Sequence, residues 1–223
     1  MISSILVDIG NTNTKWKFEE DYFILPTEKF EFDLLPRCSK IWVSNVSLNF
    51  FESKKFNIRF VESQERYKSL VNAYSDPKLL GCDRWLGMIA SYELSEEKSF
   101  VLVDIGTAIT IDIVNKSGAH LGGLIFPGLD KIRQTFHKFS VASSGDINAL
   151  GLTTEEAWGN GTIALVVNTI NQKIREIKNE TPDISVFLTG GGYSDLQNFL
   201  DFDHIYHKNL VLDGLQFYVD YVG

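Results

Sequence analysis

Two short apolar runs, each ending in Asp-Ile-Gly, stand out in the pattern of hydrophobic and polar positions. The first, Ile2–Gly10, leads into a Thr-rich turn and then into the alternating segment Thr14–Pro26, which predicts a buried strand followed by a hairpin. The second, Phe100–Gly106, is followed by the same kind of turn and another apolar run. Asp8 and Asp104 are 96 positions apart, a spacing that indicates a duplicated lobe rather than a solenoid repeat.

The rest of the chain predicts further strands and helices, although the pattern of residues 28–67 is the least clear. Apolar residues recur at helical spacing after Asp83, and Thr153 or Thr154 is the expected N-cap of a long helix. The polar link Ser95–Ser99 predicts a boundary between two lobes, residues 1–98 and 99–223. The predicted strands are 40–47, 55–63, 109–115, 118–128 and 184–192, and the predicted helices are 83–97, one from about 129, 153–180, one after 192, and 214–222.

Composition and charge limit the classes of function. A chain of 223 residues with 44% hydrophobic residues can form a core, and a formal charge of −8 without a basic face argues against a nucleic-acid partner. Cys38 and Cys82 are too few for a disulfide framework or a cysteine metal site. No apolar run approaches the roughly 18 residues of a membrane span, and no signal peptide is visible, so a cytoplasmic protein is expected.

The repeated Asp-Ile-Gly has two possible interpretations. A carboxylate at the end of a strand can hold Mg²⁺ or its waters, and the glycine lets backbone N–H groups approach phosphate oxygens. Alternatively, each Asp caps only its own turn. The presence of two copies favours phosphate binding, and the glycines of Leu188–Gly192 are typical of a turn beside a nucleotide.

The segment Gly81–Trp85 carries the most specific local pattern. Asp83 could be the N-cap of the following helix, or it could accept a proton from a hydroxyl group. Arg84 favours the role of proton acceptor for Asp83. A cation in the first turn of a helix is mildly unfavourable unless an anionic group, here a substrate, compensates for it.

Two other features have plain structural interpretations. Cys82 is interpreted as a filler, since nothing completes a cysteine catalytic set. His204 and His207 are spaced to touch one metal ion, but they lack a third ligand and are interpreted as a solvated surface.

Seven ordered segments together resemble the type III pantothenate kinases, with a likeness that is thin only between about residues 19 and 66. The resemblance implies an α/β fold of duplicated actin-like (ribonuclease H-like) ATPase lobes, with mixed sheets flanked by helices. It also implies a homodimer that phosphorylates pantothenate with ATP, the first step toward coenzyme A. The segments are DIGNTNTK, NAYSDPKLLGCDRW, VDIGTAITID, HLGGLIFPG, TTEEAWGNG, FLTGGG and NLVLDGL.

The same resemblance assigns roles to individual residues. Asp83 is similar to the general base of the family, and Asp8 to the residue that organises Mg²⁺. Asp104 matches a site for a monovalent cation, K⁺ or NH₄⁺, while Ile109 departs from the usual threonine, which puts one secondary hydroxyl contact in doubt. The implied ATP contacts are Asp8, Ile9, Gly10, Asn11, Thr12, Asn13, Thr14, Lys15 and Thr107, and the implied pantothenate contacts are Tyr74, Gly81, Cys82, Asp83, Arg84 and Thr154.

Two other functions remain open from the residues. Another enzyme of the same superfamily, either a different small-molecule kinase or a phosphatase acting on polyphosphate, would share the ATP elements and differ at Gly81–Arg84. A non-enzymatic descendant acting in transcription is the second, and the retained Asp8, Asp83 and Asp104 argue against it.

Overall fold

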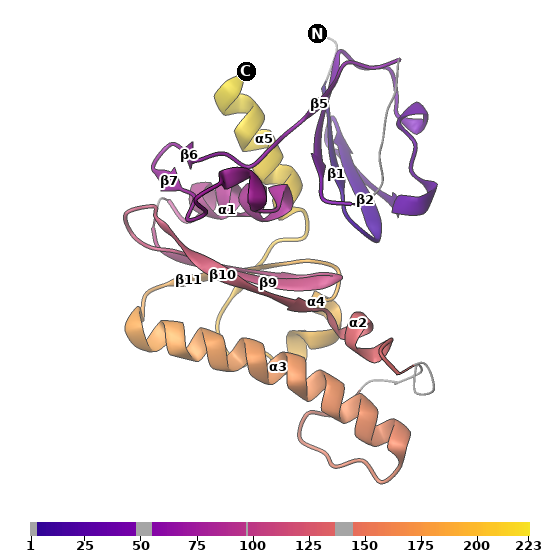
Figure 1. Cartoon of the computed structure of the whole chain (residues 1–223), viewed down its shortest axis with the longest axis vertical. Helices are drawn as coiled ribbons and strands as arrows, with labels where there is room; N and C mark the ends of the chain where they lie inside the picture. The colour runs from indigo at the N-terminus through magenta and orange to yellow at the C-terminus, as the bar shows by residue number, and fades with distance from the viewer. Residues whose placement is uncertain (1–3, 48–54, 97, 137–144) are drawn as a thin grey trace. The chain divides into compact units, whose positions relative to one another are not determined.

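The computed structural model describes residues 4–47, 55–96, 98–136 and 145–223 (Figure 1). The start of the predicted first strand, residues 2 and 3, and Glu97 of the polar link lie outside the described residues. The chain divides into two compact units. The first consists of Met1–Ser99, Val114–Gly122 and Asn209–Gly223, and the second of Phe100–Ile113 and Gly123–Lys208.

The first unit is built on a five-stranded mixed sheet in the order β3-β2-β1-β4-β5. The central strand β1 is antiparallel to β2 and parallel to β4, with Asp8 opposite Lys15 on one side and Ser44 on the other. The strands are β1 Ser4–Ile9, β2 Asn13–Phe18, β3 Asp21–Pro26, β4 Lys40–Asn45 and β5 Ile58–Phe60.

The two faces of this sheet have different neighbours. Side chains of a strand alternate between faces, so Ile5, Val7 and Ile9 share one face, where they form an apolar cluster with Phe30 and Phe32. Asp8 lies on the opposite face. The contact between Trp42 of β4 and Tyr218, whose ring centroids are 6.5 Å apart, shows that the helix carrying Tyr218 covers this second face.

Two helices of the first unit, α1 (Cys82–Leu94) and α5 (Leu210–Val222), pack closely against each other. A Cβ atom on Gly214 would lie 1.9 Å from the carbonyl oxygen of Leu86, so only glycine permits this approach of the two backbones. The pair also contacts the sheet, since α5 packs on β1 and α1 packs on β4. Asp8 therefore faces the helical side of the unit.

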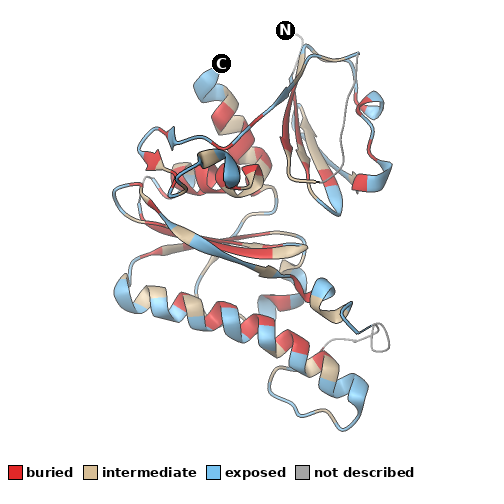
Figure 2. Cartoon of the chain, viewed as in Figure 1, coloured by how far each residue is buried: buried red, intermediate tan, exposed pale blue. Residues whose placement is uncertain are grey.

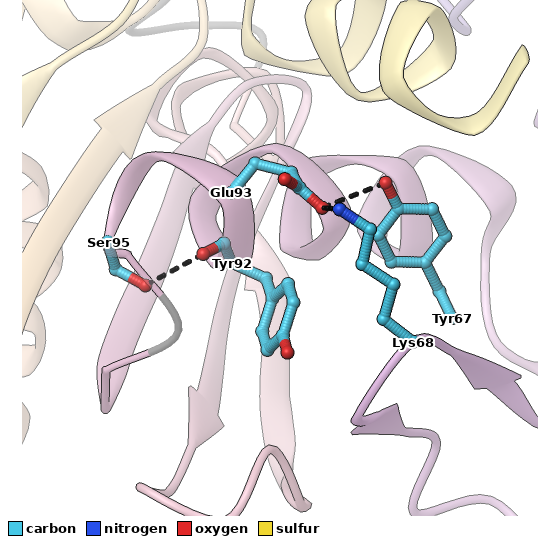
Figure 3. Close-up of polar contacts among 5 residues, drawn as sticks. All are labelled: Tyr67, Lys68, Tyr92, Glu93 and Ser95. Carbon is cyan, nitrogen blue, oxygen red and sulfur yellow. Dashed lines mark hydrogen bonds and ion pairs between the residues drawn. The ribbon is translucent and has the colours of Figure 1, made fainter. Parts of the chain in front are cut away.

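A small hairpin, β6 (Arg66–Tyr67) and β7 (Leu70–Val71), is attached to the far end of α1. Figure 3 shows Glu93 of α1 accepting hydrogen bonds from the Tyr67 hydroxyl at 2.9 Å and from Lys68 Nζ at 2.6 Å. The Tyr67 ring also packs edge-on against Tyr92. These contacts fix the start of the segment that continues from β7 toward residue 81.

The second unit repeats the strand order of the first. Its sheet has the order β10-β9-β8-β11-β12, so that in both units the first strand is central, with the second and third strands on one side and the fourth and fifth on the other. The two Asp-Ile-Gly segments thus belong to equivalent central strands, β1 and β8, of two sheets with the same strand order. The strands are β8 Phe100–Ile105, β9 Ala108–Val114, β10 His120–Pro127, β11 Ser185–Thr189 and β12 Ile205–Tyr206.

The long helix α3 (Thr154–Glu180) covers one face of the second sheet (Figures 1 and 2). Its buried stripe includes Ile163, Val167 and Ile170, which join Val101 and Val103 of β8 in the core of this unit. Two short helices, α2 (Leu129–Arg133) and α4 (Tyr193–Leu196), complete it.

The N-terminus of α3 settles which threonine is the cap. Thr153 is the N-cap, and it forms a capping box in which its hydroxyl accepts from Glu156 N at 3.2 Å while the Glu156 carboxylate accepts from Thr153 N. Such a cap is worth about 1 kcal/mol. Thr154 is the first residue of the helix proper.

The predicted strands and helices are present, but some bounds differ: β5 covers only part of the strand predicted over 55–63, and α5 begins at Leu210 rather than at 214. Within the described residues, the elements that were not predicted are short. They are the two-residue strands β6, β7 and β12, and the single turns η1 (Thr27–Lys29), η2 (Phe32–Leu34), η3 (Pro77–Leu79) and η5 (Gln197–Phe199). Across the described ranges, no helix combines the length and the apolar character needed to cross a bilayer.

Candidate active site

The turn that follows Asp8 is tight and open toward solvent. Gly10 N donates to Asn13 O at 3.1 Å, and a Cβ on Gly10 would lie 3.0 Å from that oxygen, so glycine suits this position. Asn11, Thr12 and Asn13 are exposed. The turn thus presents exposed polar groups of the kind that contact phosphate oxygens.

Thr14 supports this turn from the inside. Its buried hydroxyl lies 3.1 Å from that of Thr27, which donates to Gly10 O at 2.8 Å. Thr27 N also donates to Thr12 O at 2.9 Å. The side chain of Thr14 therefore faces the protein, while its neighbours in the turn face outward.

Asp8 has an unusual environment for a carboxyl group. Its Oδ1 atom and the hydroxyl of fully buried Ser44 have no normal hydrogen-bond partner within the described part of the chain. Burial first, and then the charge of Asp83, raise the pKa of Asp8 to about 7, while Lys15 and Ser44 partly lower it. A cation bound at Asp8 would compensate for this burial, so the residues present fit a Mg²⁺ ion.

Asp83 lies in the first turn of α1, but it is not the N-cap. The cap is Gly81, so the N-cap interpretation of Asp83 was wrong. Asp83 Oδ1 accepts from Arg84 N at 2.7 Å, and a Cβ on Gly81 would lie only 2.6 Å from the same oxygen. Glycine at position 81 therefore leaves the space that the Asp83 carboxylate occupies.

Arg84 is held by an aromatic residue of the preceding loop. Its Nη1 atom donates to the Tyr74 hydroxyl at 3.2 Å, and its guanidinium carbon lies 5.9 Å from the centroid of the Tyr74 ring. Tyr74 N in turn donates to the side chain of buried Asn72 at 3.0 Å. The first unit thus brings together Tyr74, Arg84, Asp83 and Asp8.

His120 is a further residue of this region that the sequence analysis did not single out. It is buried, its Nδ1 lies 3.4 Å from Ala73 N, and its ring is nearly parallel to that of Tyr74. A histidine opening the glycine-rich segment HLGGLIFPG was the available signal.

Cys82 is buried, and its thiol is close enough to Asp83 and Asp8 to feel their charges. Burial, as the main cause, raises the pKa of its thiol to about 12, which keeps it protonated at neutral pH. This agrees with its interpretation as a filler.

His207 and His204 are half-buried rather than fully solvated, and His204 makes two polar contacts. Its Nε2 lies 3.0 Å from the Tyr193 hydroxyl and its Nδ1 lies 2.9 Å from Phe202 O. Over the described ranges, no group of three or more His, Cys, Asp or Glu side chains is arranged to hold a metal ion. Mg²⁺ is commonly held by one carboxylate together with substrate phosphates, and Asp8 suits that mode.

The second Asp-Ile-Gly turn lies at the end of β8. Gly106 N donates to Ala108 O at 3.0 Å, and Thr107 O accepts from Gly128 N at 2.9 Å. Gly190 has a φ of +98°, and a Cβ there would lie 2.5 Å from Asp104 Oδ1. The first of the three consecutive glycines therefore makes room for Asp104, as Gly81 does for Asp83 in the first unit.

Two other predicted positions lie elsewhere in the second unit. Ile109 is fully buried in the core of this unit, so the departure from threonine adds an apolar side chain to that core. Thr154 is exposed in the first turn of α3 and does not share the turn of Asp104 and Thr107.

The family model and the curated relatives that match this chain carry the same family name. The family model described as "Type III pantothenate kinase" matches residues 36–176. A protein of that name from Pseudoalteromonas translucida is 29% identical over 228 residues, covering 97% of this chain and 96% of its own length. One from Psychrobacter arcticus is 32% identical over 167 residues, covering 73% of this chain and 66% of its own length.

Solved structures show the same fold. A Campylobacter jejuni protein described as a Baf family transcriptional activator matches with a TM-score of 0.64 and 24% identity, covering 97% of both chains. A Sinorhizobium meliloti protein described as a 2-dehydro-3-deoxygalactonokinase matches with a TM-score of 0.60 and 11% identity, covering 96% of this chain and 95% of its own. At these identities the likeness shows the fold alone, which is that of the actin-like kinases and ATPases.

Proposed function

The chain belongs to the type III pantothenate kinase family, and from that premise we propose that Asp83 is the general base of a direct phosphoryl transfer from ATP to pantothenate. Membership makes the protein a kinase, and it supports pantothenate phosphorylation, the first step of coenzyme A biosynthesis. The assignment of individual residues is the part that goes further.

The observation that carries the proposal is the pairing of Asp8 and Asp83 in one unit. The two carboxylates come from different elements, the end of β1 and the first turn of α1, yet the charge of Asp83 contributes to raising the pKa of Asp8. Two carboxylates in unlike environments are suited to different tasks. One is set to hold a cation and the other to receive a proton.

In the proposed step, the hydroxyl oxygen of pantothenate attacks the γ-phosphorus of ATP. The new bond joins that oxygen to phosphorus, the bond between the γ-phosphorus and the β–γ bridging oxygen breaks, and ADP leaves with the bond electrons. Asp83 accepts the proton of the attacking hydroxyl. The products are ADP and 4′-phosphopantothenate.

Alignment and charge supply most of the rate in such a transfer, because the transition state is loose. When bound, Mg²⁺ neutralises charge on the β- and γ-phosphates. The residues of this chain that would hold the ion and the phosphates are Asp8, Lys15 and the exposed turn at Asn11–Asn13. Thr14 keeps that turn in shape through Thr27.

Pantothenate also carries a carboxylate, and we assign its binding to Arg84, next to Asp83 in the first turn of α1. A guanidinium binds carboxylates with two parallel hydrogen bonds, and the Tyr74 hydroxyl fixes its orientation. The backbone of Gly81 and Cys82 lies beside this pair in the chain. This arrangement supports pantothenate binding at Tyr74 and Gly81–Arg84.

Asp104, Thr107 and Thr154 complete the proposal from the second unit. Asp104, whose carboxylate lies beside Gly190, would hold the monovalent cation, K⁺ or NH₄⁺, while Thr107 would contact ATP. Thr154 would contact pantothenate near the interface of a homodimer. Leu150 and Leu152, which are 93% and 95% exposed just before it, are apolar side chains suited to a subunit contact.

The decisive experiment is a coupled assay of ADP release with ATP, with and without pantothenate, on the wild type and on Asp83→Asn. The wild type should release ADP only with pantothenate. Asp83→Asn should lower kcat by at least about 10²-fold, the contribution expected of a general base, while ATP still binds. Asp33→Asn, at an exposed position in η2 of the same unit, is the matched control and should keep wild-type kinetics.

Each alternative predicts a different result. Unchanged kcat in Asp83→Asn would remove its role as base but leave the kinase. Transfer to another hydroxyl acceptor in a substrate panel, without transfer to pantothenate, would indicate a different small-molecule kinase. Specific DNA binding without any phosphoryl transfer would indicate the non-enzymatic function.

A further inference from the structure

His120, the first residue of β10, is a buried histidine to which the proposed reaction gives no role. Only 4% of the residue is exposed, and it belongs to the first unit, as Val114–Gly122 does as a whole. Its Nδ1 accepts a hydrogen bond from Ala73 N at 3.4 Å. Because a backbone N–H can only donate, Nδ1 is the acceptor and carries no proton in this bond.

The His120 ring also packs on Tyr74. The ring centroids are 6.3 Å apart and the planes differ by 8°. Tyr74 in turn accepts a hydrogen bond from Arg84 at 3.2 Å. His120 therefore contacts Tyr74 through its ring and the preceding residue, Ala73, through its Nδ1, and Tyr74 connects it to the guanidinium.

The hairpin turn that carries His120 is itself anchored on β7. Val71 N donates to Gly118 O at 2.8 Å, and Val71 forms a parallel bridge with Ala119. Gly118 has a φ of +81°, and a Cβ there would lie 2.3 Å from Ser69 O, so the turn fits only because it carries glycine. His120 is thus held on a fixed support beside the loop of Tyr74.

We infer that His120 is a positioning residue for pantothenate binding, acting through Tyr74 on Arg84. Its ring limits the orientation of the Tyr74 ring, and its Nδ1 fixes the backbone at Ala73. Arg84 is then oriented before the substrate carboxylate arrives, which lowers the cost of binding. The inference rests on the proposed function for the roles of Tyr74 and Arg84, whereas the contacts themselves do not.

Three substitutions separate the two contacts of His120. His120→Asn keeps an acceptor for Ala73 N and loses the ring, His120→Phe keeps a ring and loses the acceptor, and His120→Ala loses both. Losing one hydrogen bond and one ring contact should raise the KM for pantothenate about five- to tenfold in His120→Ala, with kcat and the KM for ATP changed by less than about twofold. The Asn and Phe variants should each restore part of the loss.

A double substitution tests whether His120 acts through Tyr74. In a Tyr74→Ala background, His120→Ala should raise the KM for pantothenate no further, since the residue through which it acts is gone. A merely structural role predicts additive effects, a raised KM for ATP and a lower melting temperature. Ser117→Ala, in the same turn and bonded to Asn115, is the matched control and should leave all three quantities unchanged.

A measurement without substrate separates failure of this inference from failure of the proposed function. In ¹⁵N NMR of the free protein, His120 Nδ1 should give the signal of an unprotonated nitrogen, and His120→Ala should broaden or shift the Arg84 side-chain signals. A protonated Nδ1, unchanged Arg84 signals, or an unchanged KM for pantothenate in His120→Ala would overturn the inference. Absence of pantothenate phosphorylation by the wild type would instead overturn the proposed function, and the same variants would then be compared by NMR.

Discussion

The two Asp-Ile-Gly turns share a topology but differ in their surroundings. In each unit the aspartate ends the central strand of a five-stranded sheet with the same strand order. Asp8 lies opposite Ser44 of the parallel strand β4. Burial and the charge of Asp83 raise the pKa of Asp8 to about 7. Asp104 instead faces Thr189 and lies beside Gly190. The motif places a carboxylate, and the neighbouring elements decide what that carboxylate can do.

The largest expected difference between the turns is in their metal dependence. Asp8→Asn should lower kcat by about 10²-fold or more and remove saturation by Mg²⁺, since it deletes the charge that would hold the ion. Asp104→Asn should keep saturation by Mg²⁺ and reduce the ratio of activity in K⁺ to that in Na⁺. Steady-state rates over titrations of Mg²⁺, K⁺ and Na⁺ measure both, and loss of the same dependence in both variants would show that the turns are equivalent.

A smaller effect is expected from the two glycines that leave room for carboxylates. Gly81→Ala places a Cβ 2.6 Å from Asp83 Oδ1, and that side chain can rotate away, so the fold should persist. Misplacing a catalytic group by about 1 Å can cost up to 10²-fold, and we expect about tenfold in kcat because rotation is partial.

Gly190→Ala should act on stability instead. Its Cβ would lie 2.3 Å from the backbone oxygen of Ile105 at a φ of +98°, which a side chain rarely adopts. Thermal unfolding and kcat of both variants make the comparison. A lower melting temperature for Gly81→Ala than for Gly190→Ala would contradict it.

The smallest effect is the pH dependence of stability without Mg²⁺. The pKa of Asp8 is raised from 3.8 to about 7, so the folded state binds its proton more tightly than the unfolded state does. Stability from this group is therefore present below about pH 4 and is lost as the pH rises through about 7. Asp8→Asn should melt a few degrees above the wild type at about pH 8 and show no such gain at about pH 4.

Saturating Mg²⁺ should reduce that difference at the higher pH, because the ion stabilises the ionised carboxylate of the wild type only. Melting curves across a pH series, with and without Mg²⁺, test this. A constant difference between Asp8→Asn and the wild type at every pH would show that the carboxyl of Asp8 is not perturbed.

Local sequence patterns predicted the long elements because their periodicity is independent of distant contacts. Strand β1, helix α1 and helix α3 each show an apolar pattern that identifies them without a partner. The two-residue strands β6 and β12 carry no such pattern, since they exist only through their pairing with β7 and β11.

The candidate site was only partly predictable for the same reason. Asp8 and Asp83 follow from motifs, and their roles from resemblance. The position of Ser44 beside Asp8 depends on the register of two parallel strands that are not consecutive in the chain. The contact of His120 with Tyr74 depends on where a hairpin turn docks. Neither can be read from spacing.

The packing of α5 against α1 has a consequence for how the protein forms in the cell. Residues 100–208 lie between these two helices along the chain and mostly belong to the other unit. During synthesis α1 therefore leaves the ribosome long before α5 has been made. The apolar surface around Leu86 stays exposed to solvent while the residues between the two helices are synthesised. The first unit therefore begins to be synthesised before the second, but it can complete its fold only after the last residues of the chain have been made.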